Sequence, residues 1–110
     1  MNEFSPQQMA ILQRLVSREF SLVAFPLYAN AVGVRKGTWA ALLDPIANGG
    51  FRVFGEPSYL LNGNLTVRIQ NEGKHWFVWK KQRMEATAER LSELEAFVAE
   101  LKLLLEPHLT

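Results

Sequence analysis

The sequence contains no cysteine. This excludes disulfide bonds, thiolate metal sites and a cysteine nucleophile, and it is consistent with a reducing compartment. The chain also lacks an apolar run long enough to cross a bilayer, because the longest, residues 22–29, is interrupted by Pro26. Residues 1–8 have neither the basic start nor the apolar stretch of a secretory signal. These absences predict a cytoplasmic protein that does not contact a membrane.

Motifs of known catalytic chemistry are absent as well. Residues 33–38 imitate a phosphate-binding loop, but their lysine precedes the second glycine, so we interpret them as a hairpin turn. His75 and His108 lie far apart in the sequence and give no metal site. Asp44 and Glu56 each precede a proline and are explained as turn formers, although two carboxylates brought together would suit acid-base chemistry. We therefore predict no catalytic residue, no metal and no cofactor, and we favour a non-enzymatic protein.

What the chain does contain is the composition of one folded domain over residues 1–110. Hydrophobic residues make up 48% and aromatic residues 11%, and a chain of this length buries roughly 65% of its unfolded surface. The net charge of +1 hides an asymmetry. Residues 1–83 hold ten Lys and Arg against five Asp and Glu, whereas residues 84–110 hold two against six. We interpret the acidic segment as the solvent-facing side of a terminal element.

A helix is predicted at each end of the chain. Ser5 precedes Pro6 and is followed by Gln8 three positions later, the arrangement of a capping box, and apolar residues at helical spacing continue to near Glu19. At the other end, Thr87 is expected to cap a long helix that stops at residues 106–107.

The C-terminal helix carries an apolar seam of residues spaced three and four apart: Leu94, Val98, Leu101 and Leu105. Two interpretations are open. The seam packs on the protein's own sheet, or it forms the interface of a homodimer. The pattern covers about two heptads, fewer than the three or four that indicate a coiled coil, so we prefer the first interpretation.

Between the helices the pattern predicts five or six short antiparallel strands. They cover residues 20–34, bent or broken at Pro26, and residues 39–43, 51–54, 58–61, 65–70 and 75–80. Residues 65–70 alternate apolar and polar types, which is typical of a half-buried strand. The fold class is therefore α+β, an antiparallel sheet flanked by an N-terminal helix and a long C-terminal helix that lies across one sheet face.

The segment from Lys74 to Arg83 combines aromatic and basic residues. One interpretation is a strand buried on both faces whose end becomes basic and solvent-exposed, and this is the one we favour. The alternative is a surface that binds anions or single-stranded nucleic acid, with bases stacked on Trp79 or Phe77. The candidate anion-binding residues are Lys74, Lys80, Lys81, Arg83 and Arg68, joined by Arg35 and Lys36 from another turn.

Three segments resemble short uncharacterised cyanobacterial proteins: residues 54–57, residues 62–65, and residues 77–81 continuing through Glu85-Ala86-Thr87. The resemblance covers roughly residues 39–101. None of these segments is a catalytic motif, so the resemblance implies no activity.

The leading hypothesis is a small non-enzymatic protein-interaction module, whose partner is another protein or a second copy bound through the seam. A small-molecule-binding or weakly enzymatic domain is the alternative, with a pocket between sheet and helix lined by Trp39, Tyr59 and Trp76. The third hypothesis is anion or nucleic-acid binding by the basic aromatic hairpin.

Overall fold

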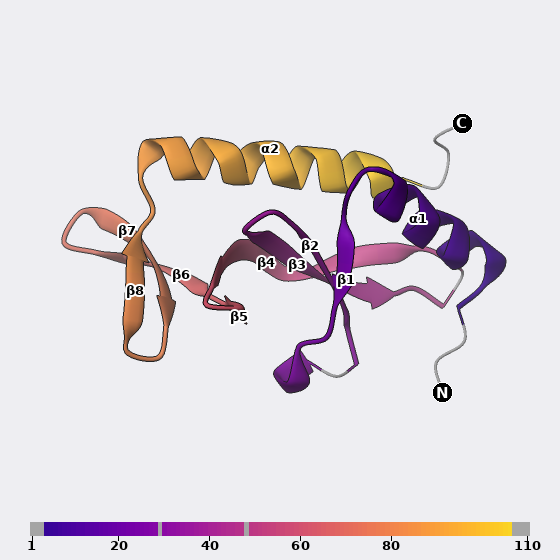
Figure 1. Ribbon diagram of the computed structural model, residues 1–110, viewed down its shortest axis with the longest axis horizontal. Coiled ribbons are helices and arrows are strands. Elements are labelled where there is room, and N and C mark those ends of the chain that lie inside the picture. The colour runs from indigo at the N-terminus through magenta and orange to yellow at the C-terminus, as the bar shows by residue number, and fades with distance from the viewer. Residues whose placement is uncertain (1–3, 29, 48, 107–110) are drawn as a thin grey trace.

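The computed structural model describes residues 4–28, 30–47 and 49–106 (Figure 1). It contains two α-helices, α1 (Pro6–Ser17) and α2 (Ala88–Leu105), and a short 3₁₀ helix, η1 (Pro26–Tyr28). The strands are β1 (Ser21–Val23), β2 (Val32–Lys36), β3 (Trp39–Pro45), β4 (Phe51–Leu61), β5 (Asn64–Leu65), β6 (Val67–Asn71), β7 (Lys74–Trp79) and β8 (Gln82–Glu85). The predicted α+β fold class, with a helix before and a long helix after the antiparallel strands, is confirmed. No helix of the described ranges is both long enough and apolar enough to pass through a bilayer.

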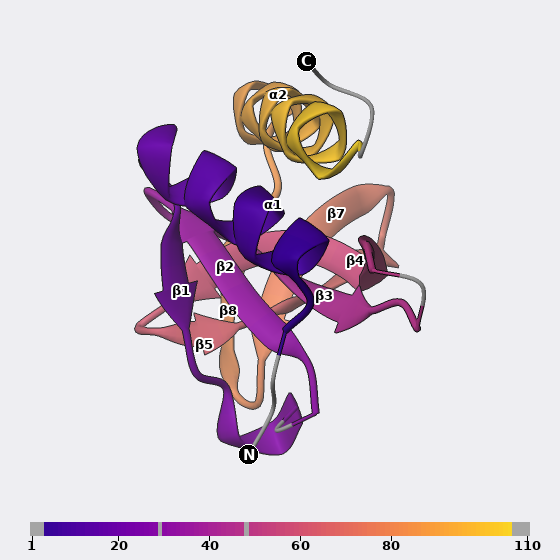
Figure 2. The ribbon, with the colours of Figure 1, turned by 90° about the vertical axis from the view of Figure 1, so that its right-hand side faces the viewer.

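The strands form two antiparallel sheets in chain order, β1-β2-β3-β4-β5 and β6-β7-β8. The division arises where the chain leaves β4. Leu65 still pairs with Leu60, and the Thr66 amide donates to the Tyr59 carbonyl oxygen, but β6 then pairs with β7 instead. The helix α2 runs along both sheets, and α1 lies beside its C-terminal half (Figures 1 and 2).

The apolar seam of α2 belongs to the chain's own core. Leu101 is fully buried, Leu94 and Leu105 are 8% and 7% exposed, and Val98 packs against the same cluster. The α1 side chains Ile11 and Leu15 and the sheet side chains Val34, Leu43 and Phe77 complete this core. These side chains pack within one chain, which supports the preferred interpretation of the seam, and self-association through Leu94, Val98, Leu101 and Leu105 stays a prediction.

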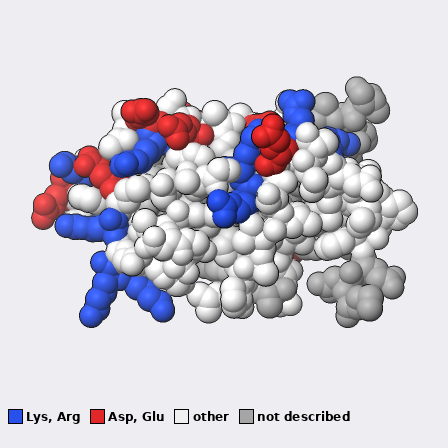
Figure 3. All heavy atoms as spheres, in the orientation of Figure 1, with Lys and Arg blue, Asp and Glu red and all other residues white. Residues whose placement is uncertain are grey.

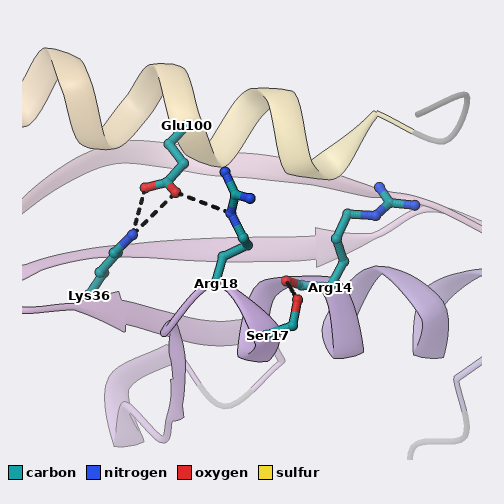
Figure 4. A network of polar contacts seen from close by, with 5 residues as sticks. All are labelled: Arg14, Ser17, Arg18, Lys36 and Glu100. Carbon is teal, nitrogen blue, oxygen red and sulfur yellow. Dashed lines mark hydrogen bonds and ion pairs between the residues drawn. The ribbon is translucent and has the colours of Figure 1, made fainter. Parts of the chain in front are cut away.

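Polar contacts fix α2 against α1 and β2 (Figure 4). The Glu100 carboxylate on α2 accepts two hydrogen bonds from the Lys36 ammonium, at 3.0 and 3.2 Å, and lies 3.9 Å from the Arg18 guanidinium. At the end of α2, Arg14 donates to the carbonyl oxygens of Leu104 and Glu106 at 2.8 and 3.0 Å. Arg14 thus satisfies carbonyl groups that the last helical turn leaves without partners.

The local end signals of both helices are confirmed. Ser5 and Gln8 form the expected capping box, and the Thr87 hydroxyl accepts from the Arg90 amide. The segment 20–34 is broken at Pro26, where η1 separates β1 from β2 and lets the two strands pair antiparallel.

The prediction of a half-buried strand at residues 65–70 is wrong. Leu65 is buried, but it belongs to β5, and all five residues of β6 are exposed. Val67 and Ile69 are 59% and 43% exposed because β6 lies at the edge of the small sheet and its apolar side chains face away from the core. The alternation of apolar and polar residues correctly predicted a strand, but it did not predict which face of that strand is exposed to solvent.

Candidate functional site

A groove of about 1080 Å³ lies between β4 and α2. Its strand side consists of Phe51, Arg52, Val53, Gly55, Glu56 and Pro57, and Arg68 of β6 stands at one end. Its helix side consists of Leu94, Glu95, Val98, Ala99, Lys102 and Leu105, followed by Glu106 at the end of the helix. The interior is thus lined by apolar side chains from both elements, with charged side chains around it.

The groove meets β4 along its edge and not on one face. Three consecutive residues, Phe51, Arg52 and Val53, line it, whereas the side chains of consecutive strand residues point to opposite faces. No described strand pairs with this edge of β4 over residues 51–57. The groove therefore lies alongside exposed strand backbone.

The β3–β4 register determines which backbone groups face the groove. The Ile46 amide donates to the Gly50 carbonyl oxygen at 2.8 Å, and the next pairs of the ladder are Pro45 with Phe51 and Asp44 with Arg52. Hydrogen-bonded and non-hydrogen-bonded pairs alternate in an antiparallel ladder, so Phe51 belongs to a non-hydrogen-bonded pair. Val53, two residues further along β4, belongs to a non-hydrogen-bonded pair for the same reason. The N–H and C=O groups of Phe51 and Val53 consequently point away from β3 and towards the groove.

A bulge ends this straight edge. The ladder jumps from Leu42 opposite Phe54 to Ala40 opposite Ser58, so residues 55–57 stand against the single residue Ala41. Gly55 has φ +69°, a left-handed conformation that glycine adopts without steric cost. Bulges bend strands and are frequent beside functional sites. Here the bulge turns β4 at the end of the groove where Arg68 stands.

The charges around the groove are arranged in pairs on the strand side. Arg52 lies 3.0 Å from Asp44, and Arg68 lies 3.7 Å from Glu56. The two carboxylates considered for acid-base chemistry, Asp44 and Glu56, thus each face a different arginine. Exposed pairs of this kind contribute little to stability, about 0–1 kcal/mol, and their side chains remain available to a ligand.

The predicted basic residues do not form one patch. Lys74 begins β7, whereas Lys80 and Lys81 follow its end, about 20 Å away at 3.3 Å per residue. Arg68 belongs to the β4–α2 groove, and Lys36 is paired with Glu100. In Figure 3 several basic side chains gather at lower left, where Figure 1 has the β7–β8 hairpin. Of the predicted residues, Lys80, Lys81 and Arg83 share the β7–β8 hairpin, and anion binding there stays a prediction.

The two stacking candidates have different environments. Phe77 is fully buried, with its ring centroid 5.6 Å from that of Trp39 and 5.9 Å from that of Tyr59. It cannot stack on a base, and Trp39 and Tyr59 are core residues and not the lining of a pocket. Trp76 is partly buried beneath the Arg83 guanidinium, 4.4 Å from the ring centroid. Trp79 alone of these candidates lines a hollow described below.

Comparison with known proteins adds no relative. The chain matches no protein-family model, and no curated protein or solved structure is significantly similar to it. The resemblance of residues 39–101 to cyanobacterial proteins stays a prediction.

A pocket between sheet and helix was one of the predictions from the sequence, but the predicted lining is wrong, because none of Trp39, Tyr59 and Trp76 lines the groove. Only the Gly55-Glu56-Pro57 segment carried a signal, since a glycine and a proline within a strand indicate a bulge or an edge. The roles of Phe51, Val53 and Ala99 depend on which strand edge stays free, and that follows from the departure of β6 towards β7.

Proposed function

We propose that the protein is an interaction module that binds an extended segment of a partner protein as an added strand along β4, beneath α2. The observation that carries this proposal is the free edge of β4 at Phe51 and Val53 inside an apolar groove. Strand addition uses such backbone groups for affinity and the neighbouring side-chain pockets for specificity.

The dimensions of the groove favour a peptide over a small molecule. Its volume of about 1080 Å³ lies at the upper limit of small-molecule pockets, which span about 300–1,000 Å³. Its helix wall extends from Leu94 to Leu105, about 16 Å at 1.5 Å per residue. That length matches about five residues of an extended chain.

The lining also defines the chemistry of the partner segment. In a strand added to β4, alternate side chains would point towards Leu94, Val98 and Ala99, and these should be apolar. The intervening side chains would face solvent. Cations and anions are equally represented around the groove, so the segment needs no large net charge. A second copy of this chain is a weaker candidate, because the bulge and proline at residues 55–57 limit how far two copies of β4 could pair.

The test is selection of a phage-displayed library of random decapeptides on the purified protein, followed by titration of the enriched peptide into labelled protein. We expect enriched sequences to alternate apolar residues. The largest amide shifts should fall on Phe51 and Val53. N-methylation of the peptide at alternate positions should abolish binding, and methylation at the positions between them should leave it intact, because only one set of amides faces β4.

Two alanines on α2 provide a matched pair of variants. Ala99 and Ala96 are both exposed, but only Ala99 lines the groove. Ala99→Trp should reduce peptide affinity at least tenfold, whereas Ala96→Trp should not change it. Equal affinities for the two variants, or enriched peptides that shift no β4 amide, would refute the proposal.

A further inference from the structure

The hairpin turn between β7 and β8 differs from the other two-residue turns of the protein. The turns that join β2 to β3, β4 to β5 and β6 to β7 each place a glycine at positive φ: Gly37, Gly63 and Gly73. The β7–β8 turn instead consists of Lys80 and Lys81, and Lys80 has φ +54°. A side chain at positive φ costs free energy that glycine avoids. Asn62 and Glu72 hold the same first position of the β4–β5 and β6–β7 turns at φ +53° and +54°, so the distinguishing feature of the β7–β8 turn is that it has no glycine and carries two adjacent ammonium groups.

This turn borders a hollow of about 390 Å³. The apolar lining comes from the segment around η1, chiefly Phe25, Leu27 and Tyr28, together with Leu65 of β5 and Trp79 of β7. Lys80 is its charged lining residue, with Nζ 5.4 Å from the centroid of the Trp79 ring. In Figure 1 these segments lie on the side of the molecule opposite α2, so the hollow is distinct from the β4–α2 groove.

A second, polar hollow of about 390 Å³ adjoins the first, and the two share Asn64, Trp79 and Lys80. Lys81 and Gln82 contribute further polar groups. The Asn62 side-chain amide donates to Gln82 Oε1 at 3.1 Å, which ties the β4–β5 turn to β8. The apolar and the cationic halves of the site are thus held next to each other before any ligand arrives.

We propose that this composite hollow binds a small aromatic carboxylate. The aromatic body would occupy the apolar half between Tyr28 and Trp79, and the carboxylate would lie at the ammonium groups of Lys80 and Lys81. The apolar volume is within the range of small-molecule sites, and a few polar groups at one end are typical of them. An oligonucleotide fits less well, because the partly exposed rings line one small hollow and form no row for successive bases, and Phe77 is buried.

The test uses 2-naphthoate as probe and its uncharged analogue 2-naphthamide as control, each titrated into ¹⁵N-labelled protein. We expect 2-naphthoate to shift the Trp79 indole N–H and the amides of the β4–β5 and β7–β8 turns. The affinity for 2-naphthamide should be at least tenfold lower, since it lacks the charge that the lysines recognise.

Lys80→Gly separates binding from folding. Glycine suits the positive φ, so this variant should unfold at the same or a higher temperature than the parent. Its affinity for 2-naphthoate should nevertheless fall at least fivefold. Lys74→Gly, at the other end of β7, should leave that affinity unchanged.

Leu27 provides a second pair of variants, because it is 71% exposed and its replacement should not disturb the core. Leu27→Asp places a carboxylate in the hollow and should abolish binding of 2-naphthoate, whereas Leu27→Asn should retain part of it. Unchanged affinity in Lys80→Gly, equal affinities for 2-naphthoate and 2-naphthamide, or shifts confined to the β4–α2 groove would each overturn the proposal. None of these outcomes affects the peptide-binding proposal, which depends on different residues.

Discussion

The side-chain amide of Gln8 on α1 donates to the carbonyl oxygen of Gly50 in the β3–β4 loop, at 3.2 Å, across 42 positions of sequence. The same nitrogen donates to the Ile46 carbonyl oxygen at 3.1 Å, while Gln8 Oε1 accepts from the Ser5 amide at 3.0 Å. One side chain therefore completes the cap of α1 and fastens that helix to the loop at the start of β4.

Gln8→Ala should lower the free energy of unfolding by about 2 kcal/mol. Gln8 is only 6% exposed, and its removal leaves the carbonyl groups of Ile46 and Gly50 without this donor. Urea denaturation measures the change. Gln13→Ala is the control, because Gln13 is exposed on the same helix and its loss should change stability by less than about 0.5 kcal/mol. Equal effects of the two substitutions would contradict this role of Gln8.

Two leucines of α2 distinguish core from surface. Leu101 is fully buried and Leu103 is 51% exposed. Leu101→Lys should unfold the protein, because an ammonium group in this core would be left unpaired and desolvated. The milder change Leu101→Ala should cost about 2–5 kcal/mol. Leu103→Lys should leave the unfolding midpoint nearly unchanged in circular dichroism. If Leu101→Lys instead gave a soluble, folded monomer, the seam would have to lie between two copies of the chain.

The features predicted correctly from the sequence are those with local causes. Ser5 and Thr87 cap helices through atoms a few residues away. The spacing of three and four residues in the α2 seam likewise predicted that one face of this helix is buried. Each of these signals depends on residues that are close together in the sequence, so the sequence alone contains the necessary information.

The features that were missed depend on contacts between distant segments. Whether β6 is covered depends on where the small sheet sits, and the β4–α2 groove exists because β6 leaves β4 after Thr66. The prediction that Lys74 and Lys80 lie in one basic patch neglected a simpler point. Lys74 and Lys80 stand at opposite ends of a six-residue strand, and strand geometry alone would have separated them.

Gly33 on β2 is required by a close approach and not by a turn. A Cβ atom there would overlap the Val23 carbonyl oxygen and lie 2.6 Å from the Phe25 ring. Gly33→Ala should therefore destabilise the protein by about 1–3 kcal/mol, the range for overpacking. Gly50→Ala is the matched control, because its Cβ would have its nearest neighbour at 3.8 Å and its φ is not positive. Thermal unfolding that responds equally to both would contradict the close approach.

The free edge of β4 makes a prediction for amide hydrogen exchange that needs no ligand. In the β3–β4 ladder Arg52 and Phe54 belong to hydrogen-bonded pairs, whereas Phe51 and Val53 direct their N–H groups to the groove. The Arg52 and Phe54 amides should consequently exchange slowly, and those of Phe51 and Val53 faster by at least tenfold in residue-resolved NMR. A peptide that adds as a strand should slow Phe51 and Val53 without changing Arg52 and Phe54. Slow exchange at all four positions in the free protein would mean that this edge is already paired, and strand addition along β4 would then be impossible.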